Sequence, residues 1–241
     1  MNILTVFIIT MIFLFACCAA VIISFSVITW QNTQTIIERV NNLSSNNNDS
    51  SSSSPLLGVD FLNLNKDFYL HSENWLDLSK SNTTLFNFTL TISSKETMCI
   101  FSNAINNNGQ LVAVIDQQQL KVAFNHEKNK VLVNPMILEL DKEYNILIGY
   151  TRNNIWTLID KSNFETINID DDVNENFNPQ NIYLGAFLKD QKFLYPYKGT
   201  LKYLKITQNG KLVAKYCFLN NKEKSENELD NTKYFNKIPL V

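Results

Sequence analysis

Apolar and polar residues alternate in short runs throughout the part of the chain beyond residue 57, and this alternation restricts the fold to β-structure. Residues 86–92, FNFTLTI, have an apolar side chain at every second position, with Asn87, Thr89 and Thr91 between them. Successive side chains of a strand point to opposite faces of its sheet, so the pattern predicts one buried and one open face. Comparable runs occur at residues 120–124, 144–150, 155–159, 164–169, 182–187, 199–207 and 211–218.

Turn-forming residues separate these runs. The clearest are NNNG, TRNN, DDDVNEN and QNG, at residues 106–109, 151–154, 170–176 and 208–210. About twelve strands at this spacing predict an all-β domain, a two-sheet antiparallel β-sandwich. We place this domain at residues 57–220 and expect residues 221–241 to form a polar C-terminal tail.

The N-terminal region has a different composition. Residues 1–37 contain no charged side chain, and residues 3–30 are almost wholly apolar. About 20 apolar residues span a bilayer as a helix, and Trp30 stands where an interfacial aromatic residue belongs. A cleaved signal peptide is the alternative, because residues 16–20 are small. The missing basic n-region and the apolar continuation favour a transmembrane anchor at residues 1–32.

A linker joins this anchor to the strand-rich domain. Apolar residues recur at helical spacing over residues 36–43, and residues 41–54 are nearly all Asn and Ser. The second composition cannot bury a core. We therefore expect a short helix and an Asn/Ser-rich stalk at residues 33–56, with the domain on the exported side of the membrane.

The overall charge excludes one class of partner. Lys and Arg total 21 against 23 Asp and Glu, which gives a formal net charge of −2. Such a chain has no general electrostatic attraction to nucleic acid. The chain is also rich in Asn, and its basic residues are mostly Lys.

Three stretches match the order and spacing of a known family. They are LFNFTLTI and its continuation to Asn125, LELDKEYNILIGYTRNNIWTLID at residues 138–160, and IYLGAF…YPYKGTLKYLKI at residues 182–206. Together they resemble the laminin G-like branch of the concanavalin A-like lectin/glucanase fold, a jelly roll, over roughly residues 68–219. Two departures stand out: the family's Trp-His pair is Tyr144-Asn145, and Thr200 replaces the cysteine of its late disulfide.

The resemblance implies a non-catalytic module that binds a glycan or a protein. In glucanases of this fold an E-x-D-x-E strand carries the catalytic carboxylates, and here Glu139, Asp141 and Glu143 have that spacing. Lys142 stands where an apolar residue should pack, and the run adjoins the start of a predicted strand. A turn is therefore favoured over a catalytic site, and a glycan-cleaving enzyme is the alternative.

The resemblance also implies candidate metal and covalent sites. Such domains often hold a calcium ion at the rim, which makes Asp170, Asp171 and Asp172 candidate ligands, a solvated acidic loop being the alternative. Because chain ends commonly adjoin in this fold, Cys99 and Cys217 are predicted to form a disulfide, with two separate buried thiols as the alternative. No other cofactor is indicated. Four N-glycosylation sequons begin at Asn42, Asn48, Asn82 and Asn87.

The organisation of the whole chain suggests a setting. An uncharged N-terminal anchor, together with abundant Asn and Lys, resembles the envelope proteins of large DNA viruses of arthropods. This resemblance implies an attachment protein of a virion envelope. The alternative is a structural protein that organises an envelope or membrane by packing against its neighbours.

Overall fold

The computed structural model describes residues 62–64, 68–76, 78, 81–103, 111–124, 130–151, 153–169, 180–189, 192–218 and 224–239. The predicted anchor (1–32) and the predicted helix and stalk (33–56) lie outside these residues. In the part of the chain described, no helix has the length and apolarity needed to cross a membrane. The described residues form strands and their connections.

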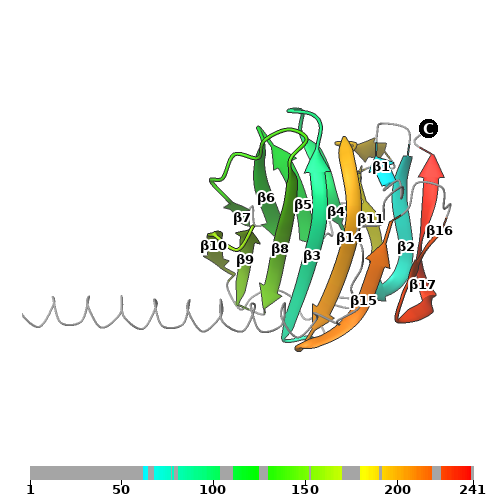
Figure 1. The fold of residues 1–241 in the computed structure, drawn as a ribbon. Coiled ribbons are helices and arrows are strands. Elements are labelled where there is room, and N and C mark those ends of the chain that lie inside the picture. Colours follow the sequence, from blue (N-terminus) through cyan, green and yellow to red (C-terminus); the bar gives the residue numbers. More distant parts are fainter. Residues whose placement is uncertain are drawn as a thin grey trace, which may run out of the picture. The chain divides into compact units, whose positions relative to one another are not determined.

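Two antiparallel sheets face each other (Figure 1). The seven-stranded sheet has the order β1-β14-β3-β8-β9-β10, with β15 paired to β14. Its strands are β1 (Leu62–Leu64), β3 (Thr83–Ile92), β8 (Glu143–Thr151), β9 (Asn154–Ile159), β10 (Asn163–Asn168), β14 (Gly199–Gln208) and β15 (Lys211–Cys217).

The eight-stranded sheet has the order β16-β17-β2-β11-β4-β5-β6-β7. Its strands are β2 (Phe68–Leu76), β4 (Met98–Ser102), β5 (Leu111–Asp116), β6 (Gln119–Phe124), β7 (Lys130–Val133), β11 (Gln180–Leu184), β16 (Lys224–Asn227) and β17 (Asp230–Pro239). A separate hairpin consists of β12 (Phe187–Lys189) and β13 (Lys192–Leu194).

The inward faces of the two sheets form the core. In β3 every second residue from Phe86 to Ile92 is fully buried, and the residues between are partly exposed. The rings of Phe86 and Phe101 join the sheets, with centroids 4.6 Å apart. The predicted all-β antiparallel sandwich is therefore confirmed, because the alternation read from the sequence corresponds to one core-facing side of each strand.

The entry into β14 is fixed by contacts with β3. Tyr197 is buried, and its hydroxyl donates a hydrogen bond of 2.7 Å to the carbonyl oxygen of Thr91. A Cβ at Gly199 would lie 2.0 Å from the same carbonyl oxygen, so only glycine permits this approach. The aromatic and glycine of the closing stretch in the sequence thus set the register of β14 against β3.

The expected polar tail at residues 221–241 is wrong over the described residues 224–239. There β16 and β17 form a hairpin, and β17 pairs with β2 at the edge of the eight-stranded sheet. Phe235 is fully buried, and its ring lies 4.8 Å from that of Tyr216 in β15. The burial of Phe235 and the pairing of β17 with β2 thus hold in the fold a segment that is polar overall.

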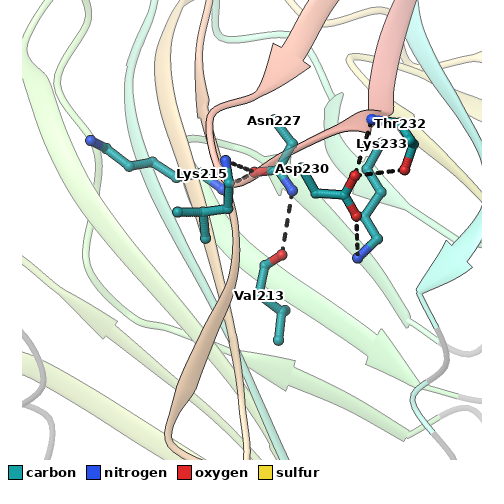
Figure 2. Close-up of polar contacts among 7 residues, drawn as sticks. Val213, Lys215, Asn227, Asp230, Thr232 and Lys233 are labelled. Carbon is teal, nitrogen blue, oxygen red and sulfur yellow. Dashed lines mark hydrogen bonds and ion pairs between the residues drawn. The ribbon is translucent and has the colours of Figure 1, made fainter.

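The turn between β16 and β17 is tied to β15 of the other sheet (Figure 2). Asn227 is buried, and its Oδ1 accepts hydrogen bonds from the backbone N–H groups of Lys215, at 2.9 Å, and Leu229, at 3.1 Å. Its Nδ2 donates to the carbonyl oxygen of Val213 at 3.4 Å. The Lys215 side chain is also tied to this turn, because its ammonium group forms an ion pair of 2.7 Å with Glu228.

Candidate functional site

Six polar side chains form the central part of the outer face of the seven-stranded sheet, and we call this set the polar face. They come from four strands that lie side by side, β8, β3, β14 and β15 (Figure 1). The set comprises Asn87, Thr89, Asn145, Tyr203, Lys205 and Lys215. All six are partly or fully exposed, because the strand residues next to them face the core.

One row of the polar face runs across the strands from Asn145 to Tyr203. Thr89 pairs with Asn145 on one side and with Tyr203 on the other. The Thr89 hydroxyl donates to Asn145 Oδ1 at 3.0 Å. This hydrogen bond orients the Asn145 amide, whose Nδ2 has no acceptor within hydrogen-bond distance among the described residues. The row thus presents an oriented amide donor.

Tyr203 places an aromatic ring at the end of this row. It pairs with Cys217 of β15, and its hydroxyl hydrogen-bonds the Cys217 thiol. Burial, followed by the neighbouring thiol, raises the pKa of Tyr203 above its ordinary value. The hydroxyl therefore stays protonated at neutral pH and remains both a donor and an acceptor.

A second row contains Asn87, Lys205 and Lys215. Lys205 pairs with Asn87 of β3 and with Lys215 of β15. Residues two positions apart along a strand are about 7 Å apart, and neighbouring strands are about 5 Å apart. The two rows therefore cover a polar area about 14 Å wide across the four strands. Amide, hydroxyl, phenol and ammonium groups lie side by side in this area.

The polar face adjoins an apolar region on β8, β9 and β10. Leu147, Trp156 and Leu158 are buried on this side of the sheet, and Phe164 is partly exposed. The rings of Trp156 and Phe164 lie 5.9 Å apart. Because only Phe164 of these four residues is partly exposed, the apolar region bounds the polar face on this side.

A second aromatic cluster lies on the outer face of the eight-stranded sheet. The Tyr69 and Phe193 rings are 3.9 Å apart, and those of His71 and Tyr183 are stacked at 5.1 Å. Tyr69 and Tyr183 are buried, and burial raises the pKa of Tyr69. Because Phe193 belongs to the β12–β13 hairpin, the cluster serves to dock that hairpin on the sheet.

The carboxylates of the E-x-D-x-E run do not lie on one strand. Asp141 is in a turn with φ of 58°, and Glu143 is the first residue of β8. Glu139 forms an exposed ion pair of 2.5 Å with Lys142, and Glu143 forms one with Lys202. The turn favoured from the sequence is confirmed, and the alternating geometry of a glucanase strand is not formed.

The predicted calcium ligands Asp170, Asp171 and Asp172 lie outside the described residues. Within the described ranges, no group of three or more His, Cys, Asp or Glu side chains is arranged to hold a metal ion. Asp160, the residue after β9, accepts a hydrogen bond of 2.9 Å from the backbone N–H of Asn145. This carboxylate therefore closes the turn after β9.

The predicted disulfide between Cys99 and Cys217 is not formed, because neither cysteine is disulfide-bonded. Cys99 lies on the outer side of β4, packed against Phe187 of the hairpin, whereas Cys217 lies on the outer side of β15 in the other sheet. Packed sheets are about 10 Å apart, and a disulfide needs Cα atoms within about 7 Å. Burial also raises the pKa of the Cys99 thiol.

Two of the four sequons lie within the described residues. Asn82 is exposed just before β3, where its backbone N–H donates to Asn209 Oδ1 at 2.9 Å. Asn87 is partly exposed in the middle of the polar face, between Leu147 and Lys205. Asn42 and Asn48 lie outside the described residues.

Sequence reasoning did not identify the polar face. The alternation of residues 86–92 showed that Asn87 and Thr89 face away from the core, but it did not show which strands flank them. The order β15-β14-β3-β8 brings together residues that are more than 50 positions apart, such as Thr89 and Asn145.

Among solved structures, the fold is similar to that of a native heptameric SAP-like pentraxin from Limulus polyphemus. The TM-score is 0.50 at 17% identity, over 61% of this chain and 74% of the pentraxin. A candidate carbohydrate binding protein from Bacteroides ovatus gives a TM-score of 0.50 at 9% identity, over 75% of this chain and 62% of that protein. Domains LG4-5 of the mouse laminin α1 chain give a TM-score of 0.49 at 12% identity, over 65% of this chain and 43% of the laminin chain.

No protein-family model matches the chain, and no curated protein matches its sequence. At these identities the first two likenesses establish the fold alone, an antiparallel β-sandwich of the jelly-roll kind.

Proposed function

We propose that this protein is a non-catalytic binding module that recognises a glycan on the polar face. The observation that carries the proposal is the row formed by Asn145, Thr89 and Tyr203, in which an oriented amide lies beside an exposed hydroxyl and a phenol. Sugar hydroxyls are both donors and acceptors, and these three groups supply both functions.

The rigidity of the scaffold supports the same proposal. The row lies on the central strands β3, β8 and β14, which are hydrogen-bonded on both sides. Sites built on strands hold their side chains more accurately than sites built on loops. The carbohydrate binding named for the similar Bacteroides ovatus protein agrees with this class of ligand.

We propose that residues 1–32 anchor the module in a membrane and that its C-terminal domain is exported, as an attachment protein of a virion envelope. The support is the uncharged apolar run, which is longer than a bilayer requires. The Asn/Ser-rich stalk at residues 33–56 would then hold the module near the membrane surface.

A glycan array tests the proposed function. The full-length chain, solubilised in detergent, should bind at least one glycan, and Tyr203→Ala should lower the signal about tenfold or more. His71→Ala changes a partly exposed ring on the opposite sheet, and this control should bind as the wild type does. Absence of binding to every glycan, or equal loss with both variants, would contradict the proposal.

A structural role in an envelope or membrane is the second candidate. It is favoured by the edge strand β7, where Val131 and Val133 are each 42% exposed. Exposed apolar edge strands invite pairing with another chain. Under this alternative the chain should self-associate in analytical ultracentrifugation, Val131→Lys should return it to a monomer, and no glycan should bind.

A further inference from the structure

Two lysines lie directly opposite each other on neighbouring strands of the polar face. Lys205 of β14 is in register with Lys215 of β15, and both side chains are partly exposed. Like charges at directly opposed positions of one sheet face repel each other. Such an arrangement is disfavoured in the free protein and becomes favourable when an anion lies between the two ammonium groups.

The carboxylates near this pair do not neutralise it. Lys215 forms an ion pair of 2.7 Å with Glu228, in which the side chains are 37% and 41% exposed. Among the described residues, Lys205 has no carboxylate within ion-pair distance. Two positive charges therefore stand against one negative charge, although the whole chain carries a net charge of −2.

A neutral donor completes the arrangement. Asn87 flanks Lys205 on the side away from Lys215, and its side-chain amide has no hydrogen-bond partner among the described residues. The three side chains lie on adjacent strands, within two strand spacings, or about 10 Å. An amide and two ammonium groups present only donors toward this position when Asn87 turns its Nδ2 inward.

We infer that the ligand of the polar face is an acidic saccharide, whose carboxylate or sulfate group binds between Lys205 and Lys215. This inference rests on the proposed function and specifies its ligand class. The anionic group lies at the second row, and the sugar hydroxyls reach Asn145 and Tyr203 in the first row. Because the ion pair of Lys215 with Glu228 is solvent-exposed and weak, the ligand anion competes with Glu228 effectively.

Binding of three polysaccharides tests the inference. The full-length chain in detergent is measured by biolayer interferometry on immobilised heparin (sulfate and carboxylate), hyaluronan (carboxylate only) and dextran (neutral). Heparin, hyaluronan or both should bind more tightly than dextran, and the affinity should fall as salt is raised. Binding to hyaluronan shows that a carboxylate suffices, whereas binding to heparin alone assigns the site to sulfate.

Variants that remove a positive or a negative charge at the proposed site show whether the acidic saccharide binds there. Lys205→Gln and Lys215→Gln should each lower the affinity about two- to fivefold, the range expected of one exposed ion pair. Glu228→Gln should raise it by a similar factor, because it releases Lys215. The matched control is Lys121→Gln in β6 of the other sheet, since Lys121 is also partly exposed and paired with Asp116, at 2.7 Å. This control should leave the affinity unchanged.

The failures of the two proposals are distinguishable. If dextran or another neutral glycan binds as well as heparin and hyaluronan, and Tyr203→Ala removes that binding, the acidic ligand is wrong and the glycan module stands. If Lys121→Gln weakens binding as much as Lys205→Gln, the attraction is general and the assigned site is wrong. If the chain binds no saccharide, the proposed function is wrong as well.

Discussion

The indole of Trp156 lies across Gly149 on the outer face of the seven-stranded sheet. The two residues are directly opposite in register on β9 and β8, and a Cβ at position 149 would lie 1.9 Å from Trp156 Cε2. Trp156 is buried in this position. The missing side chain of one strand thus makes room for the largest side chain of the next, and this pair forms the apolar boundary of the polar face.

Gly149→Ala should destabilise the domain by about 1–3 kcal/mol, because the new methyl group must displace a packed indole. The expected decrease in melting temperature is a few degrees, measured by tryptophan fluorescence. In the double variant Gly149→Ala/Trp156→Leu, the loss in free energy of unfolding should be smaller than the sum of the losses of the two single variants. The reason is that leucine leaves room for the methyl group introduced at position 149, which the indole does not. A Gly149→Ala protein as stable as the wild type would contradict this packing.

Asn227→Ala should cost about 1–3 kcal/mol in the free energy of unfolding. The substitution leaves two backbone N–H groups, of Lys215 and Leu229, without the acceptor that they have in the structure. Denaturant unfolding checks the prediction. Asn153→Ala provides the control, because Asn153 is exposed, and its substitution should change stability by less than about 0.5 kcal/mol.

The two cysteines of the domain should differ in reactivity. In a Cys17→Ser/Cys18→Ser background, Ellman's reagent should modify Cys217 in the native protein, because this residue is partly exposed. Cys99 should react only after unfolding, since it is buried and burial raises its pKa. A native protein in which neither thiol reacts until a reductant is added would instead support a disulfide.

Phe235→Ala should destabilise the fold by about 3–5 kcal/mol, the usual cost of removing a buried phenylalanine. The ring is fully buried against Tyr216 and Phe218, so its loss leaves a cavity between the sheets. Tyr234→Ala removes a neighbouring ring that is partly exposed and should cost clearly less. Equal, small effects of both variants in denaturant unfolding would mean that residues 224–239 are the tail expected from the sequence.

The sequence predicted those strands whose buried side is wholly apolar. The runs at residues 86–92 and 144–150 have an apolar residue at each core position, and β3 and β8 follow them closely. By contrast, β16 is the run KSEN, and its residue Ser225 is buried without being apolar. Such a strand is specified by its partner β17 rather than by its own composition, so alternation cannot find it.

The disulfide and the polar face depend on contacts between distant segments. Cys217 falls in the predicted strand at residues 211–218, but the sequence does not state which sheet that strand joins. The sequence likewise does not show that Lys205 and Lys215 lie opposite each other, because this depends on how β14 pairs with β15. Their register includes a bulge between Ile206 and Thr207, and a shift of one residue would move Lys215 off this face.

The position of a bound glycan tests the central claim most directly. A crystal structure of the chain with a glycan selected from the array should show the sugar on the outer face of β3, β8 and β14. Its hydroxyls should lie within about 3.2 Å of Asn145 Nδ2 and the Tyr203 hydroxyl. A sugar bound instead against Phe193 and His71 on the other sheet would contradict the account.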